Sequence, residues 1–171
     1  SGAPTNFYLT LSPEPIKITN ADLEEVEIVL SPDHKVFEHT NPLRGLTEGG
    51  TFIMQSNEPP LAVWKGLPAA ARRLIRERSI NFYVVDAFSI AKENAPTQDL
   101  QIRMMGIAFI GAMCGNVSQV VGKSNEETLL TKIQNQIQKK FGGKGDKVVA
   151  SNSIVEPSAV ILPRPRLMFE L

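Results

Sequence analysis

The chain has 171 residues, of which 42% are hydrophobic and 21% are charged. This length and composition are typical of one folded domain with a substantial core, and they exclude an intrinsically disordered chain. Eighteen basic residues balance eighteen acidic ones, so the net charge does not indicate nucleic-acid binding.

The charges are nevertheless placed unevenly along the chain. Acids outnumber bases nine to three between Glu14 and Glu58, whereas bases lead thirteen to seven between Lys65 and Lys147. A surface polarised in this way suits electrostatically matched partner subunits. Ordinary solvated faces explain the same pattern equally well.

The few potential metal ligands exclude several kinds of site. Cys114 is the single cysteine, so the chain alone can form neither a disulfide nor a ligand set for an iron–sulfur cluster. His34 and His39 lack a supporting Cys/His cluster, so we expect no zinc site. The start Ser1-Gly2-Ala3-Pro4 lacks an initiator Met, which indicates a cut N-terminus or a segment of a longer chain. There is no secretory signal, and we expect the protein to be cytoplasmic.

Two short strands are predicted first. Phe7, Leu9 and Leu11 alternate with polar residues, which is the period of a strand with one buried face. The prolines that follow predict a turn, and Ile16–Ile18 can form a second strand. Together they would make a hairpin or an edge pair.

Strands and helices then alternate between residues 26 and 94. The predicted strands are Val26–Leu30, Thr51–Gln55 and Ile80–Val85, and the predicted helices are Asp33–His39, Pro68–Arg78 and Ala87–Asn94, the last capped by Asp86. Leu43 and Leu46 predict a short helix before the second strand, and Gly49-Gly50 a turn with positive φ. Such alternation predicts a three-layer α/β fold, with a mostly parallel sheet and helices on both faces.

Four arginines lie on the outer side of the helix predicted after Pro68, namely Arg72, Arg73, Arg76 and Arg78. They could grip phosphate. A solvated basic face on an amphipathic helix is the more common explanation, and we favour it.

The helix predicted from Gln98 to Cys114 is apolar on almost every side. Its apolar run is shorter than the roughly 20 residues that span a bilayer. Such a helix is buried, either in this domain or against another subunit. Gly106 and Gly111 would permit a neighbouring backbone to approach closely.

The last part of the chain predicts one more helix and an arm. Leu129, Ile133, Ile137 and Phe141 recur every four residues in a helix that ends at Gly142-Gly143. The glycine-rich turn lacks the spacing of a phosphate-binding loop. Residues 153–171 are predicted to be an extended linker or docking arm.

Polar side chains follow the second strand of the alternating region at Gln55, Ser56 and Asn57. Because ligands of parallel α/β sheets bind beyond the carboxyl ends of the strands, these are the candidate ligand contacts. No nucleophile–base pair and no Gly-x-Gly-x-x-Gly fingerprint is present. On its residues alone the chain is an α/β domain with a candidate site where the strands of Met54 and Val85 end.

Five motifs occur in an order that resembles one family. They are Ser1–Thr5 with Phe7–Leu11 and Glu14-Pro15-Ile16, then Leu46–Ser56, Asn81–Ala87 with Ile90-Ala91, Gln101–Gly115 and Lys139–Val149. Together they resemble the gamma domain (domain III) of the pyruvate:ferredoxin oxidoreductase family of thiamine-dependent 2-oxoacid:acceptor oxidoreductases. The resemblance covers residues 1–152, which we take as the domain. The Gly-rich half that opens the family domain is absent before Ser1, and the family's Asn-Ser-Pro reads Gln55-Ser56-Asn57 here.

The resemblance implies a non-catalytic part of an enzyme that oxidatively decarboxylates pyruvate or a related 2-oxoacid. Thiamine diphosphate, Mg and 4Fe–4S clusters would then lie on partner domains, with ferredoxin or a similar protein as electron acceptor. The gamma domain would help to form the coenzyme A site, through Gln55, Ser56 and Asn57, together with Ser1, Gly2 and Thr5. We expect no catalytic residue and no membrane or nucleic-acid partner. The alternative is a stand-alone α/β module for nucleotide-ligand binding or assembly.

Overall fold

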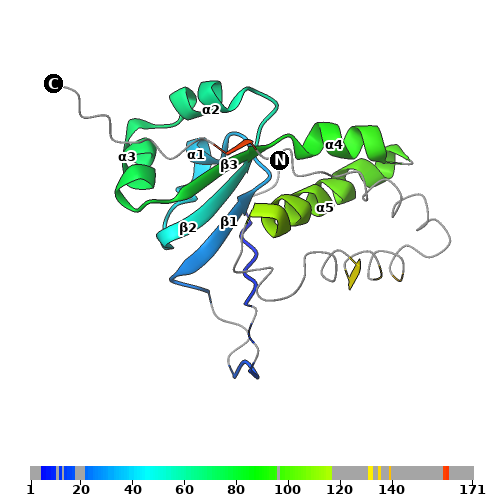
Figure 1. Ribbon diagram of the computed structural model, residues 1–171, viewed down its shortest axis with the longest axis horizontal. Coiled ribbons are helices and arrows are strands. Elements are labelled where there is room, and N and C mark those ends of the chain that lie inside the picture. The colour runs from blue at the N-terminus through cyan, green and yellow to red at the C-terminus, as the bar shows by residue number, and fades with distance from the viewer. Residues whose placement is uncertain are drawn as a thin grey trace.

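The computed structural model describes residues 5–10, 12, 14–17, 22–95 and 97–116, together with positions 131, 132, 135, 139, 160 and 161. Its elements are β1 (Val26–Ser31), α1 (Val36–His39), β2 (Leu46–Gln55), α2 (Pro60–Gly66), α3 (Ala69–Glu77), β3 (Asn81–Val85), α4 (Ala87–Asn94), α5 (Gln98–Asn116) and β4 (Val160–Ile161) (Figure 1).

The strands form one sheet in the order β1-β2-β3-β4. β1, β2 and β3 are parallel, with Leu30 opposite Ile53 and Gln55 opposite Val85, and the short β4 is antiparallel to β3. The predicted mostly parallel sheet is therefore confirmed. In this register the carboxyl ends of the three parallel strands meet at one edge.

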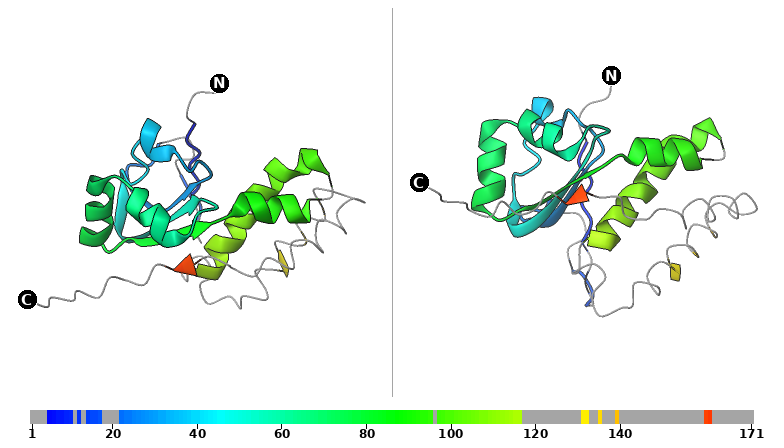
Figure 2. Two further views of the ribbon diagram at one scale, coloured as in Figure 1. Left: turned by 90° about the horizontal axis from the view of Figure 1, so that it is seen from above. Right: turned by 45° about the horizontal axis from the view of Figure 1, so that its top comes forward.

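Alternate side chains of β2 and β3 enter two separate cores. One core contains Phe52 and Phe82 and packs against side chains of α1, α2 and α3. The other contains Ile53 and Tyr83 and packs against α4 and α5. Figure 2 shows α4 and α5 together on one side of the sheet, apart from the other three helices. The predicted three-layer arrangement follows from the period of two in each strand.

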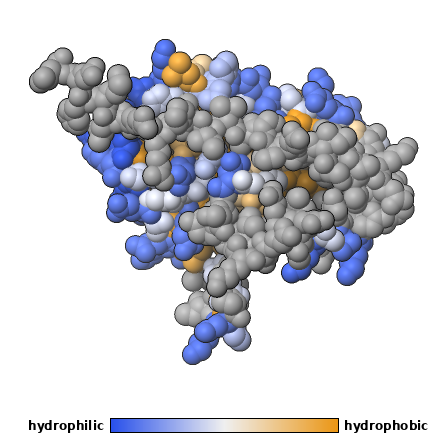
Figure 3. Space-filling view, in the orientation of Figure 1, coloured by the Kyte–Doolittle hydropathy of each residue, from blue (hydrophilic) through white to orange (hydrophobic). Residues whose placement is uncertain are grey.

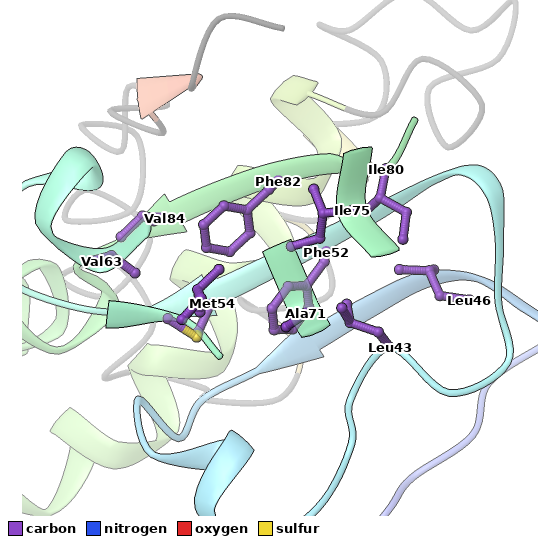
Figure 4. Packing of buried hydrophobic residues seen from close by; sticks show 11 residues of the cluster. Leu43, Leu46, Phe52, Met54, Val63, Ala71, Ile75, Ile80, Phe82 and Val84 are labelled. Carbon is purple, nitrogen blue, oxygen red and sulfur yellow. The ribbon is translucent and has the colours of Figure 1, made fainter. Parts of the chain in front are cut away.

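Phe52 is the centre of the first core (Figure 4). It is fully buried, its ring stacks on Phe82 at a centroid distance of 5.5 Å, and the Phe37 ring meets it edge-on at 5.9 Å. Ala71 and Ile75 of α3 close this core. The helices expected after Pro68 and Asp86 are both present.

The short helix predicted around Leu43 and Leu46 is wrong. Both leucines are buried, but the segment between them forms turns, and Leu46 begins β2. Gly45, at φ +78°, ends the turn and directs the chain into the strand. A Cβ at Gly45 would collide with the carbonyl oxygen of Glu24, so neither the conformation nor the space admits a side chain.

The turn predicted at Gly49-Gly50 is also wrong, because both glycines lie inside β2. Gly49 does have the expected positive φ, at +71°. The pairing of β1 with β2 shifts register between Val26 and Ile28, opposite this part of β2. Gly49 thus lies inside a continuous strand that begins at Leu46, earlier than the expected start at Thr51.

The hairpin predicted at the N-terminal end is wrong over the described residues. Residues 5–10 and 14–17 contain no strand, and Phe7 and Leu9 are 87% and 64% exposed. Alternation of apolar and polar residues favours a strand only where a neighbouring strand pairs with it, and the described residues form no such strand pair here.

The predicted helix ending at Phe141 lies mostly outside the described residues, although Thr131, Lys132, Asn135 and Lys139 are helical. The glycine turn after it and most of the predicted arm also lie outside, apart from the two residues of β4.

The two positive-φ glycines give a matched test of the fold. Gly49→Ala should cost about 1–2 kcal/mol of unfolding free energy, because only the left-handed conformation is unfavourable and open space surrounds the new Cβ. Gly45→Ala should cost roughly 2–5 kcal/mol, because overpacking against Glu24 is added. Urea denaturation of both variants measures the difference, and equal losses would contradict the tight turn at Gly45.

Candidate functional site

The candidate site is the edge of the sheet where β1, β2 and β3 end. Ser31 ends β1 and is buried, and its hydroxyl donates to the carbonyl of Asp33 at 3.0 Å. The Asp33 carboxylate accepts from the backbone N–H of Lys35 at 2.8 Å. The loop between β1 and α1 is therefore fixed by its own polar side chains.

Gln55 ties the end of β2 to the first turn of α4. Its side-chain nitrogen donates to Oδ1 of Asp86 at 3.2 Å, and its side-chain oxygen accepts from the backbone N–H of Phe88 at 3.2 Å. The residue is only 7% exposed. Both ends of the carboxamide thus have partners within the protein, and Gln55 acts as a clamp between strand and helix.

Asp86 is the N-cap of α4, and Oδ1 accepts from the backbone N–H of Ser89 at 3.1 Å. Partial burial raises the pKa of Asp86, but hydrogen bonds from the side chain and backbone of Ser89 and from Gln55 outweigh it, and the pKa lies below its ordinary value. A carboxylate ionised at neutral pH therefore occupies the positive end of α4, where a bound anion would otherwise be favoured.

Ser56 and Asn57 face different surroundings. Ser56 is buried, its backbone N–H donates to Val85 at 3.1 Å, and its hydroxyl accepts from the N–H of Glu58 at 3.1 Å. Asn57 is exposed. The structure therefore brings Gln55 and Ser56 into internal contacts at the predicted edge, and it presents Asn57 to solvent.

The remaining predicted contacts lie at the N-terminal end, and for all six predicted residues contact with a ligand stays a prediction. Thr5 is exposed in the N-terminal segment, whereas Ser1 and Gly2 lie outside the described residues. Their contact with a ligand stays a prediction.

Phe88 is a feature of this edge that the sequence reasoning missed. Its side chain is 49% exposed although it lies in the first turn of α4. Ala87 and Ala91 are buried on the other side of that helix, so helical periodicity could have placed Phe88 on the outside. Leu61, in the first turn of α2, is 58% exposed. In Figure 3 hydrophilic residues dominate the visible described surface, with apolar side chains over α2 and near α4.

The four arginines of the α3 region make contacts within the chain. Arg72 donates to the carbonyl of Lys65 at 2.6 Å, Arg78 donates to that of Leu46 at 3.0 Å, Arg76 lies over the Trp64 ring, and Arg73 pairs with Glu77 at 3.8 Å. These contacts support the explanation as an ordinary basic face of an amphipathic helix over a phosphate grip.

One further feature lies apart from the predicted site. An open cleft of about 400 Å³ lies between α1 and α3, with Phe37, Leu74 and Arg73 among its lining, and none of the predicted ligand contacts lines it. Within the described ranges, no group of three or more His, Cys, Asp or Glu side chains could hold a metal ion. No described helix has the length and apolar character needed to cross a membrane.

Comparison with known proteins decides the family. The model of the family described as pyruvate ferredoxin/flavodoxin oxidoreductase matches residues 1–155. The chain belongs to this family. The resemblance seen in the order of its motifs is thereby confirmed.

Similar proteins are much longer than this chain. It is 25% identical over 152 residues to the pyruvate-flavodoxin oxidoreductase of Trichormus variabilis, and the match covers 89% of this chain and 12% of that protein. It is 28% identical over 159 residues to the mitochondrial pyruvate dehydrogenase (NADP+) of Euglena gracilis, covering 91% and 8%. The chain thus spans roughly an eighth or less of these two relatives.

The fold has a counterpart among solved structures. The pyruvate oxidoreductase subunit PORC of Thermotoga maritima superposes with a TM-score of 0.51 at 20% identity, over 77% of this chain and 60% of PORC. At this identity the likeness shows a shared fold.

The Asp86 cap generates a pH-dependent prediction. Because hydrogen bonds place the folded pKa below the unfolded one, the charge of Asp86 stabilises the fold above the unfolded value, and this contribution is lost as the pH falls through the folded value. Asp86→Asn keeps a capping oxygen without the charge. The wild type should therefore exceed this variant in unfolding free energy at pH 7, and the difference should shrink as the pH falls below about 3.8.

Asp86→Ala removes the cap altogether and should cost about 1 kcal/mol at pH 7. Asp99→Asn, an exposed acid in the first turn of α5, is the matched control for the loss of a charge. Thermal or urea denaturation from pH 7 to pH 3 measures all three variants. A gap between wild type and Asp86→Asn that stays constant over this range would contradict the proposed role of the charge.

Proposed function

We propose that this protein is a non-catalytic, gamma-type part of a pyruvate:ferredoxin or pyruvate:flavodoxin oxidoreductase. The family match over residues 1–155 carries the proposal. The shared fold with a chain described as a pyruvate oxidoreductase subunit supports it. We take residues 1–152 as the domain and residues 153–171 as a linker or docking arm, of which Val160–Ile161 pair with β3 of this chain.

The chemistry of the described edge agrees with a supporting role. Gln55, Ser56 and Asp86 use their polar atoms to hold strands and helix together. In this proposal companion domains supply thiamine diphosphate, Mg and 4Fe–4S clusters, and ferredoxin or flavodoxin accepts the electrons. This chain contributes a rigid wall and an assembly surface.

The coenzyme A contact that the resemblance implies can be compared with the residues present. Carboxylates of Asp33, Glu58 and Asp86 outnumber the single amine of Lys35 in the described loops beyond the parallel strands. Asp86 also occupies the N-terminus of α4. Phosphate groups do not fit such an edge. The neutral amide arm of the coenzyme does fit the exposed carboxamide of Asn57, and we assign that contact to Asn57.

The first test removes the chain from its enzyme. The native complex is purified with and without this chain, and pyruvate-dependent reduction of ferredoxin or flavodoxin is measured. The activity of the complex should fall to background without the chain, because the companion domains lose a wall of their active site. Unchanged activity in its absence would remove the proposal.

Fractionation of the source cells tests the proposed cytoplasmic location, since the Euglena relative is named as mitochondrial.

The second test concerns Asn57. Asn57→Ala should raise the KM and Kd for coenzyme A roughly two- to tenfold, because one hydrogen bond contributes about 0.5–1.5 kcal/mol. The kcat and the KM for pyruvate should not change. Glu58→Gln, the exposed neighbour, is the control. Binding measured by calorimetry on the assembled enzyme gives a readout besides activity, and an unchanged Kd would exclude the contact.

The stand-alone module remains a second candidate. The exposed face of α5 favours the stand-alone module only if the native protein is a monomer. Size-exclusion chromatography of the native protein distinguishes the two, since the module predicts a free monomer and the oxidoreductase part predicts a larger complex.

A further inference from the structure

Helix α5 has one covered face and one uncovered face. Ala108 and Ala112 are at most 2% exposed and lie in the core that α5 shares with α4 and the sheet, and Met104, one turn earlier, is 3% exposed. On the other side Ile102 is 79% exposed and Ile110 is 38% exposed. Within the described chain one side of α5 is therefore covered, and burial of the other side against another subunit stays a prediction.

The uncovered residues form a row. Ile102, Gly106 and Ile110 are four residues apart, so they lie one above the other along the helix. Gly106 is exposed, and a Cβ placed there would meet no atom within 4 Å. The close approach expected at Gly106 is thus not made by any described residue. We call Ile102, Gly106 and Ile110 the outer row. It has a large apolar side chain at each end and a glycine without a side chain between them.

The outer row differs from the other exposed apolar residues. Single exposed apolar side chains such as Leu61 are normal on a protein surface. Two isoleucines that flank a glycine on one helix face instead have the form that receives a neighbouring helix, with a large side chain seated over the glycine.

We propose that the outer row is the docking surface for a helix of the companion part of the oxidoreductase. This rests on the proposed function. The matched stretch is only 12% of the Trichormus protein, so most of such an enzyme is available to cover the row. PORC, which shares the fold, is described as a subunit. The occupant is an apolar helix with a large aliphatic side chain opposite Gly106.

Charge at the end of the row favours a companion over a second copy. Asp99 is exposed and lies three residues before Ile102, on the same side of α5. In an antiparallel pair of copies crossing at Gly106, Asp99 of one copy would face Met113 of the other. In a parallel pair Asp99 would face the same carboxylate. A companion helix can instead place a lysine or arginine opposite Asp99.

Cysteine labelling in the assembled enzyme tests the surface. Cys114 is buried, so a new thiol reports its own site. Ile102→Cys is compared with Leu61→Cys, which is exposed on α2 across the sheet. The complex is purified through a companion part and treated with a charged maleimide. Ile102→Cys should react at least tenfold more slowly than Leu61→Cys, and the two should react equally in urea. Equal rates in the native complex would overturn the proposal.

A photo-reactive residue at Ile102 identifies the occupant. A cross-link to a companion segment is the expected result. A cross-link to a second copy of this chain, or none at all, would overturn the proposal. If the Ile102 variants fail to assemble, Ile110→Cys and a photo-reactive residue at Ile110 give the same readouts. A chain that does not copurify with pyruvate-oxidising activity contradicts the proposed function, whereas copurification with fast labelling contradicts only this surface.

Discussion

The structure depends on the parallel register of β1, β2 and β3. Because Gln55 lies opposite Val85, the end of β2 reaches the residue after β3, where Asp86 caps α4. A slip of one residue would turn every side chain of β2 to the other face, exchanging Phe52 and Ile53 between the two cores. The clamp of Gln55 on Asp86, and the layers of helices on both faces, are consequences of this one alignment.

Sequence signals predicted those elements whose contacts lie between residues close together in the chain. The Asp86 cap joins a side chain to a backbone N–H three residues on, so the sequence contains all of its evidence. The N-terminal strand failed because the pattern at Phe7 and Leu9 requires a pairing partner, which no local rule supplies. The prediction of a helix at Leu43 and Leu46 was wrong. The two leucines have helical spacing, but Gly45 with its positive φ makes the segment a turn. Spacing alone cannot distinguish the two.

The position of the strand ends was predicted, but not the contacts made there. Strand-end logic placed Gln55 and Ser56 at the edge where β2 ends, but their hydrogen-bond partners come from residues up to 33 positions away. Only the folded register shows that these side chains are already engaged, and that Asn57 is the exposed one. The same geometry makes the edge acidic through Asp86. An edge held together by its own polar groups positions a neighbouring site better than it binds an anion.

Helix α5 shows how one sequence feature can serve two surfaces. A helix that is apolar all round is stable in water only if both sides are covered. The sheet and α4 cover one side of α5. Full burial of an isoleucine contributes about 1.5–3 kcal/mol, so leaving Ile102 and Ile110 in water forgoes a few kcal/mol that a neighbouring helix could recover. A free-standing domain would gain by placing polar residues there, which agrees with the docking surface proposed for this face.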